Sequence, residues 1–231
     1  MAPSTAPSRT PGTPASEREL RTQGKRTMAN LLDAGMEVLT ERGYHAARVD
    51  DIVRVARTSH GTFYLYFANK EDLFRALAAE CAEEMKGLAA SLEPIKPGPE
   101  GEAELRRWVA QFLDTYRRYG AVIRAWMEDQ VADRKLVRLG LEAFQSITAS
   151  LESKMVAAAP GHLHDTALAT STLLAMVERF AYYSTSRDLG IDDDAAVDTL
   201  TKMIHRGFFG APVTPSAGPA GAKAKRARAR R

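Results

Sequence analysis

The side chains best suited to molecular recognition lie in the segment TSHGTFYLYFANK, from Thr58 to Lys70. Histidine, threonine, tyrosine and lysine can hydrogen-bond a base edge or a phosphate oxygen. An outward leucine, Leu65, can contact a thymine methyl group. The chain contains no nucleophile elbow, dinucleotide fingerprint, phosphate-binding loop or His-Glu-x-x-His motif. The pattern therefore favours nucleic-acid binding and predicts that the protein is not an enzyme.

The aromatic run FYLYF, residues 63–67, is compatible with either a strand or a helix. No adjacent strand patterns joined by a hairpin signal occur, so a lone strand would leave its backbone groups unpaired. Ser59 is a good N-cap, and Asn69 followed by Lys70, Glu71 and Asp72 begins another helix. We therefore expect FYLYF to belong to a short helix between these two caps.

At about 100° per residue, such a helix has one anchoring side and one presented side. Phe63 and Phe67 share the anchoring side. The presented side carries Gly61, Thr62 and Leu65, flanked by Tyr64 and Tyr66. Upstream, residues 49–56 predict a preceding helix, and the turn Arg57–Ser59 joins the two. This is the plan of a helix-turn-helix, whose second helix enters the DNA major groove.

The segment GYHAARVDDIVRVARTSHGTFYLYFANKEDLF, residues 43–74, resembles the DNA-binding region of TetR-type bacterial transcriptional regulators. The family pattern runs Gly-aromatic, a Thr/Ser pair, an Ile-Ala helix, Ser-x-Gly-Thr-Leu-Tyr-x-Tyr/His-Phe and Lys-Glu-x-Leu. The resemblance implies an all-α fold with an N-terminal three-helix helix-turn-helix DNA-binding domain and a larger helical ligand-binding and dimerisation domain. It also implies a homodimer on a palindromic double-stranded DNA operator, most often a repressor, released by a small-molecule effector.

The residues predicted to face DNA are Arg48, Thr58, Ser59, His60, Gly61, Thr62, Tyr64, Leu65, Tyr66 and Lys70. A solvated histidine at the helix start is the alternative for His60, and packing at the rim is the alternative for both tyrosines. Three residues depart from the family pattern. Arg48 replaces a capping Thr or Ser but can reach a phosphate, Arg57 replaces the turn glycine, and Val53 replaces an alanine.

The resemblance implies a DNA-binding domain over residues 20–75 and a helical effector-binding and dimerisation domain over 76–210. Composition predicts a disordered tail before them, over residues 1–19, and a disordered basic tail after them, over 211–231. The last part carries six cations and no acid, so the rest of the chain is mildly acidic despite the net charge of +3. The basic tail suits sequence-independent attraction to phosphates or, equally, a solubilising role.

Within the effector domain, residues 93–102 predict a loop. An apolar face from Leu105 to Tyr116 predicts a helix that ends near Gly120. A second face, formed by Val137, Leu141, Phe144, Leu151 and Met155, predicts a helix that continues toward Pro160. The last two helices, near residues 166–186 and 192–208, are where the resemblance implies subunit pairing.

The resemblance also implies an effector pocket in this domain. The candidate lining residues are Phe112, Tyr116, Trp126, Met127, Phe144, Met176, Phe180 and Tyr183. Ordinary core packing is the alternative for each of them.

Cys81 is the only cysteine, which excludes an internal disulfide and any multi-cysteine metal site. No apolar segment approaches bilayer-spanning length, and the N-terminal residues lack a secretory pattern. We therefore expect a cytoplasmic protein without cofactor, metal or membrane partner. Two other hypotheses remain open: a DNA-associated protein that binds mainly through its basic tail, and a helical small-molecule-binding protein without operator recognition.

Overall fold

The computed structural model describes residues 22–127, 133–158, 165–186 and 190–209, and these ranges form eight α-helices and no strand. The predicted all-α fold class is confirmed. The helices are α1 (Thr22–Ala46), α2 (Val49–Val55), α3 (His60–Tyr66), α4 (Lys70–Ser91), α5 (Pro99–Met127), α6 (Arg134–Ala158), α7 (Thr166–Ser186) and α8 (Asp193–Phe208). Both predicted disordered tails lie outside the described residues.

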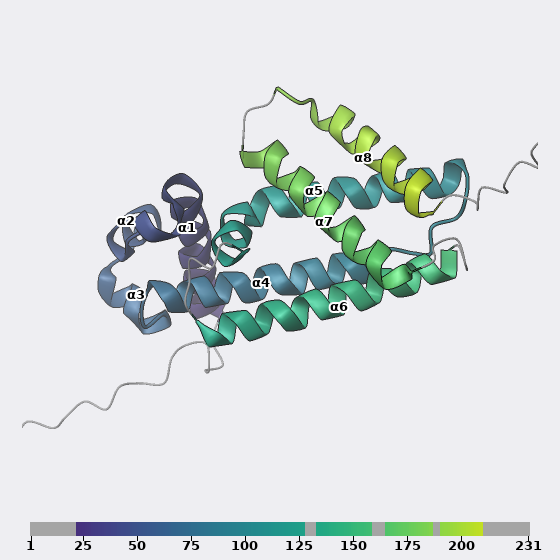
Figure 1. Ribbon diagram of the computed structural model, residues 1–231. Helices are drawn as coiled ribbons and strands as arrows, with labels where there is room; N and C mark the ends of the chain where they lie inside the picture. Colours follow the sequence, from purple (N-terminus) through teal and green to yellow (C-terminus); the bar gives the residue numbers. More distant parts are fainter. Residues whose placement is uncertain (1–21, 128–132, 159–164, 187–189, 210–231) are drawn as a thin grey trace, which may run out of the picture.

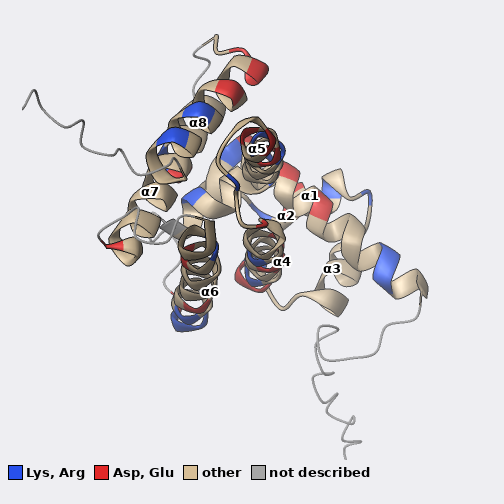
Figure 2. Cartoon of the chain, turned by 90° about the vertical axis from the view of Figure 1, so that its right-hand side faces the viewer, with Lys and Arg blue, Asp and Glu red and all other residues tan. Residues whose placement is uncertain are grey.

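Three long helices, α4, α5 and α6, run beside one another and form the body of the molecule (Figure 1). Figure 2 looks nearly along their axes, with α1, α2 and α3 on one side and α7 and α8 on the other. The helix-turn-helix segment therefore lies at one end of the long helices.

The apolar residues form two clusters that meet along the long helices. The first contains Leu31, Phe63, Phe67 and Phe74 from the N-terminal helices, each no more than 2% exposed. It also includes Tyr119, Val122, Ala125 and Leu136, which belong to α5 and α6. The second cluster joins α4, α5, α6, α7 and α8. The N-terminal helices thus share part of their core with α5 and α6.

The C-terminal end of α1 is bent at Gly43, which has φ 74° and ψ 167°. A residue with a side chain is disfavoured at this positive φ, whereas glycine accepts it. Three more residues follow the bend in the helical segment. Tyr44, directly after it, is buried and packs edge-on against Phe74, with ring centroids 5.0 Å apart.

Two predicted boundaries in the effector domain differ from the structure. The loop ends earlier than expected because α5 begins at Pro99, where a proline's missing N–H costs no helical hydrogen bond. The same helix continues past Gly120 to Met127. Burial of Val122 and Ala125 sustains it there, against the cost of about 1 kcal/mol for an internal glycine.

The apolar face predicted for α6 is buried only in its second half. Leu151 and Met155 are buried, whereas the earlier residues Val137, Leu141 and Phe144 are all more than half exposed. At its start the helix instead buries Leu136, which joins the first cluster. A helix that contacts different neighbours at its two ends buries different faces there, and sequence periodicity alone does not reveal this.

The predicted division at residue 75 falls inside a continuous helix, because α4 runs from Lys70 to Ser91. Cys81 is buried in this helix, and burial raises the pKa of its thiol to about 12. The thiol therefore belongs to the core.

Candidate nucleic-acid interface

The turn between α2 and α3 is tight and contains one strained residue. Arg57 has φ 51°, the only positive φ at a non-glycine residue within the described ranges. The N–H of the next residue, Thr58, donates to the carbonyl oxygen of Val53 at 2.9 Å and closes the turn. The replacement of the family's turn glycine by Arg57 thus places a side chain at a position that favours glycine.

Ser59 caps α3 as predicted. Its Oγ accepts a hydrogen bond from the backbone N–H of Thr62 at 3.1 Å and lies 3.0 Å from Thr62 Oγ1. Arg48, by contrast, makes no side-chain capping bond at the start of α2. Its side chain is exposed.

The aromatic run is helical from Phe63 to Tyr66, as predicted, whereas Phe67 is the extended C-cap residue of α3. The segment has two distinct sides. Phe63 and Phe67 are 0% and 2% exposed, whereas Tyr64 and Leu65 are 56% and 69% exposed. Gly61 is also exposed, and a Cβ atom added there would meet only Ser59 Oγ, at 3.7 Å. The phenylalanines hold the helix while its outer side stays open to a partner.

Two candidates, Thr62 and Tyr66, lie at the border between these sides. Both are half-buried, and Tyr66 packs against the first apolar cluster. Thr58, in the turn, is half-buried as well. The structure therefore gives Tyr66 a packing role beside any contact made by its hydroxyl group.

His60, at the start of α3, is held by a residue that the sequence did not single out. Its Nε2 lies 2.6 Å from Oδ1 of Asp50 on α2. Both side chains are more than half exposed. The sequence shows an acid in the first turn expected for α2. It does not show that this acid pairs with a residue ten positions away, because the pairing depends on the angle between two helices.

Lys70, the first residue of α4, contacts α1. Its Nζ donates to the backbone oxygen of Tyr44 at 2.7 Å and lies 4.5 Å from the centre of the Tyr44 ring. An ammonium group has three donors, so two remain for a phosphate.

Asp51 joins α1 and α2 beneath this surface, another contact that the sequence did not predict. Its carboxylate accepts from Arg54 at 2.8 Å and pairs with Arg42 at 3.1 Å. The hydrogen bond from Arg54 and the nearby charge of Arg42 hold the pKa of this carboxyl below its usual range. The acid orients two arginines and remains ionised near neutral pH.

Residues 31–77 match the family described as "Bacterial regulatory proteins, tetR family". The helix-turn-helix segment of this chain is thus that of the tetR family. The matched segment runs from the middle of α1 into α4 and contains the whole helix-turn-helix.

Curated regulator proteins are similar to part or most of the chain. The "Fatty acid metabolism regulator protein" of Bacillus subtilis is 46% identical over 50 residues, 22% of this chain and 26% of that protein. The first curated relatives are thus matched over less than two thirds of their length. The "HTH-type transcriptional activator FasR" of Mycolicibacterium smegmatis is 25% identical over 80% of this chain and 84% of its own length.

Solved structures share the fold over most of the chain. The transcriptional regulator FadR from Bacillus subtilis in complex with stearoyl-CoA aligns with a TM-score of 0.56 and 20% identity. The alignment covers 76% of this chain and 96% of that one. The chain therefore shares its helical fold with this structure beyond the helix-turn-helix.

The effector-pocket candidates lie in different environments. Phe112 and Tyr116 are buried in the second cluster, where Tyr116 Oη donates to Glu178 Oε1 at 3.0 Å. Trp126 packs against the first cluster and donates from Nε1 to the backbone oxygen of Leu136 at 3.1 Å. These side chains thus make packing contacts and hydrogen bonds within the protein.

The remaining candidates are more exposed. Met176 and Phe180 are half-buried against the second cluster. Phe144 and Tyr183 are 53% and 43% exposed. The side chain of Met127 lies outside the described part of the structure. The described candidates therefore do not converge on one enclosed space.

A groove of about 410 Å³ lies between the start of α5 and α8, and none of the candidates lines it. Arg106 on its wall is bonded to Asp198 at 2.6 Å and to Asp194 at 2.9 Å. No helix within the described ranges is long and apolar enough to cross a bilayer.

Proposed function

We propose that this chain is a ligand-responsive transcriptional repressor that binds a palindromic operator as a homodimer through α3. The observation that carries the proposal is the contrast between the buried Phe63 and the exposed Tyr64 and Leu65 on one short helix. A helix that packs one side against the core and exposes the other to solvent can enter the major groove of DNA.

The presented side chains suit both sequence recognition and positioning. Thr62 and His60 supply hydrogen-bonding groups for base edges, and Leu65 supplies an apolar contact for a thymine methyl. Tyr64 and Arg48, both exposed at the rim, are suited to phosphate oxygens. We propose these roles on the basis of exposure and chemistry, with Gly61 allowing a close approach of the backbone.

We propose that α7 and α8 pair two subunits. Their outward sides carry exposed apolar residues, with Leu168 at 65%, Tyr183 at 43% and Met203 at 58%. The sequence ALATSTLLAM on α7 is rich in small residues that permit close helix approach. Two recognition helices related by a two-fold axis read half-sites about 10 bp apart, or a multiple of that spacing.

For the effector, we propose a fatty acyl-CoA as the first chemical class to test. A curated relative is named for fatty acid metabolism, and a solved neighbour holds stearoyl-CoA. Binding in the helical domain would favour an arrangement whose α3 spacing no longer matches the operator. We place this regulator in the cytoplasm and assign it no catalytic role.

Selection from random double-stranded DNA at near-physiological salt tests DNA recognition. Sequencing of the bound pool should give an inverted repeat that is retained when residues 211–231 are deleted. A pool without a consensus would support the tail-driven or ligand-binding alternatives. In a second step, stearoyl-CoA should release the selected operator, whereas coenzyme A alone should not.

The regulatory sign is tested separately, because FasR is named an activator. The selected operator is placed between a promoter and a reporter gene. A fall in expression on adding the protein supports repression, whereas a rise from an upstream operator would replace the repressor assignment with an activator.

A further inference from the structure

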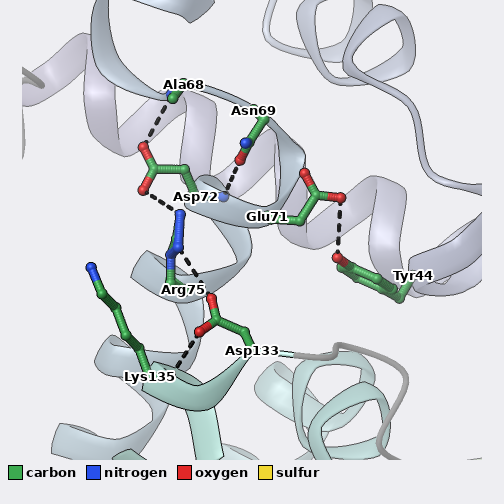
Figure 3. A network of polar contacts seen from close by, with 8 residues as sticks. All are labelled: Tyr44, Ala68, Asn69, Glu71, Asp72, Arg75, Asp133 and Lys135. Carbon is green, nitrogen blue, oxygen red and sulfur yellow. Dashed lines mark hydrogen bonds and ion pairs between the residues drawn. The ribbon is translucent and has the colours of Figure 1, made fainter.

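Arg75, in the second turn of α4, joins two segments far apart in the sequence (Figure 3). Its Nη1 donates to Oδ2 of Asp133 at 3.1 Å, and its Nη2 donates to Oδ1 of Asp72 at 3.1 Å. Asp133 also accepts, through Oδ1, from the backbone N–H of Lys135 at 2.7 Å. This carboxylate therefore lies at the start of α6 and caps it.

Asp72 extends the connection to the recognition helix. Its other oxygen, Oδ2, accepts from the backbone N–H of Ala68 at 3.0 Å, two residues after the end of α3. The backbone N–H of Asp72 donates to Oδ1 of Asn69 at 2.8 Å. The short connection between α3 and α4 is thus bound to a carboxylate that Arg75 also holds.

These side chains are shielded more than those of an ordinary surface pair. Arg75, Asp72 and Asp133 are 30%, 23% and 19% exposed. For comparison, Arg118 on α5 pairs with Glu84 on α4, and these side chains are 60% and 41% exposed. Water and salt screen exposed ion pairs and weaken them. The more shielded bridge through Arg75 is therefore better suited to hold α4 and α6 together.

The other side of the first turn of α4 is attached to α1. Lys70 donates to the backbone oxygen of Tyr44, and Tyr44 Oη donates to Oε1 of Glu71 at 3.4 Å. The start of α4 therefore contacts the rest of the DNA-binding helices on one side and α6 on the other. Arg75 makes the second of these connections.

We propose that Arg75 is a positioning residue for the recognition helix. The bridge Asp133–Arg75–Asp72 sets the orientation of α3 according to the position of α6, and so links the helical domain to DNA binding. The regulatory meaning of this bridge rests on the proposed function. The link itself can be measured without DNA, so the two can fail separately.

Four full-length variants test the bridge. Arg75→Met removes the guanidinium but keeps an apolar stem, and Asp133→Asn removes the charge but keeps an amide oxygen that can cap α6. The double variant combines them. Arg118→Met is the matched control, because it removes an ion pair between α4 and α5 that lies farther along α4 from α3.

Hydrogen exchange of the free protein is the first measurement. Peptides covering residues 60–69 should exchange roughly fivefold faster in Arg75→Met and in Asp133→Asn, the factor expected from the loss of one partly shielded ion pair. In the double variant, the increase in exchange rate should be smaller than the product of the two single increases, because both changes break the same bridge. The control should change exchange in this segment by less than about twofold.

DNA binding is the second measurement, made on the operator selected by the unaltered protein and on random DNA. Both single variants should weaken operator binding roughly fivefold and leave random DNA nearly unchanged. The two substitutions change net charge in opposite directions, so a shared loss cannot arise from the overall field.

Three results would overturn the inference: unchanged exchange in residues 60–69, equal weakening on both DNAs, or opposite effects of the two variants on operator affinity. Equal weakening would identify Arg75 as a simple phosphate contact. If the unaltered protein selects no operator, the proposed function fails, and the exchange measurement still decides whether the bridge positions α3.

Discussion

Asp50 and His60 are ten residues apart in the chain, yet Oδ1 of the aspartate lies 2.6 Å from Nε2 of the histidine. This contact directs the imidazole at the start of α3 and places an acid beside the proposed DNA surface. If α3 binds DNA as proposed, the aspartate has two opposed effects: it orients a histidine proposed to contact a base, and it repels nearby phosphates.

We predict that Asp50→Ala strengthens binding to random DNA while reducing discrimination between the operator and a site altered at the base pair nearest His60. One good base contact contributes about 1–3 kcal/mol of discrimination. Competition binding with the two duplexes measures both effects. Glu41→Ala, which removes an exposed acid from α1, controls for charge. If both variants bound every duplex more tightly by the same factor, Asp50 would not orient His60 for base recognition.

Phe63 and Leu65 lie on opposite sides of α3 and are 0% and 69% exposed. We predict that Phe63→Ala lowers the free energy of unfolding by about 3–5 kcal/mol, because it opens a cavity in the core. Leu65→Ala should change stability by less than about 0.5 kcal/mol but relax preference at one operator position. Urea unfolding and operator competition measure the two effects. A large stability loss in Leu65→Ala would mean that this side chain packs inside.

Arg57 carries the backbone strain of the turn, with φ 51°. We predict that Arg57→Gly is more stable than Arg57→Ala by about 1 kcal/mol, because both variants lose the same charge and only glycine relieves the strain. Denaturant midpoints of the two variants provide the comparison. Identical midpoints would show that the turn relaxes around any side chain.

Arg48 occupies the N-cap position of α2 without capping it. We predict that Arg48→Ser stabilises the protein by about 1 kcal/mol relative to Arg48→Ala, through a new bond to a free N–H of the first turn. If Arg48 contacts a phosphate, both variants should bind DNA more weakly and with a salt slope smaller by about one. Unfolding curves and a salt titration separate the two roles, and an unchanged slope would exclude the phosphate contact.

We predict that the protein loses stability at alkaline pH because three of its tyrosines are buried. Burial raises the pKa of Tyr44 and of Tyr119 to about 12. The second cause is the negative charge of Glu71 for Tyr44 and of Glu84 for Tyr119. Burial and Glu178 also raise the pKa of Tyr116. The unfolded chain loses its phenolic protons first, above pH about 10, so stability is complete below that pH and falls as pH rises toward the folded values.

Unfolding in urea from pH 9 to 11.5 measures this loss. Tyr119→Phe should show a smaller fall across this range, whereas Tyr64→Phe, at an exposed position, should follow the unaltered protein. Equal pH slopes in all three proteins would assign the alkaline loss to other groups.

Local sequence determined the elements of the proposed interface. Ser59 and Asn69 cap their helices because a capping side chain bonds to an N–H three residues ahead, within its own segment. The four-residue spacing of Phe63 and Phe67 likewise determined which side of α3 is buried, since helical periodicity is a local property. These features depend on neighbours along the chain, so sequence patterns predicted them.

Tertiary structure alone decided which distant side chains meet. The pairs of Asp50 with His60 and of Arg75 with Asp133 depend on how helices cross, and helix crossing is set by packing across the whole core. The same cause turns Tyr66 toward the core and leaves Phe144 exposed on a helix face that is buried farther along. The sequence by itself thus determined α3 and the caps of α3 and α4, whereas the three-dimensional packing decided what holds α3 in place.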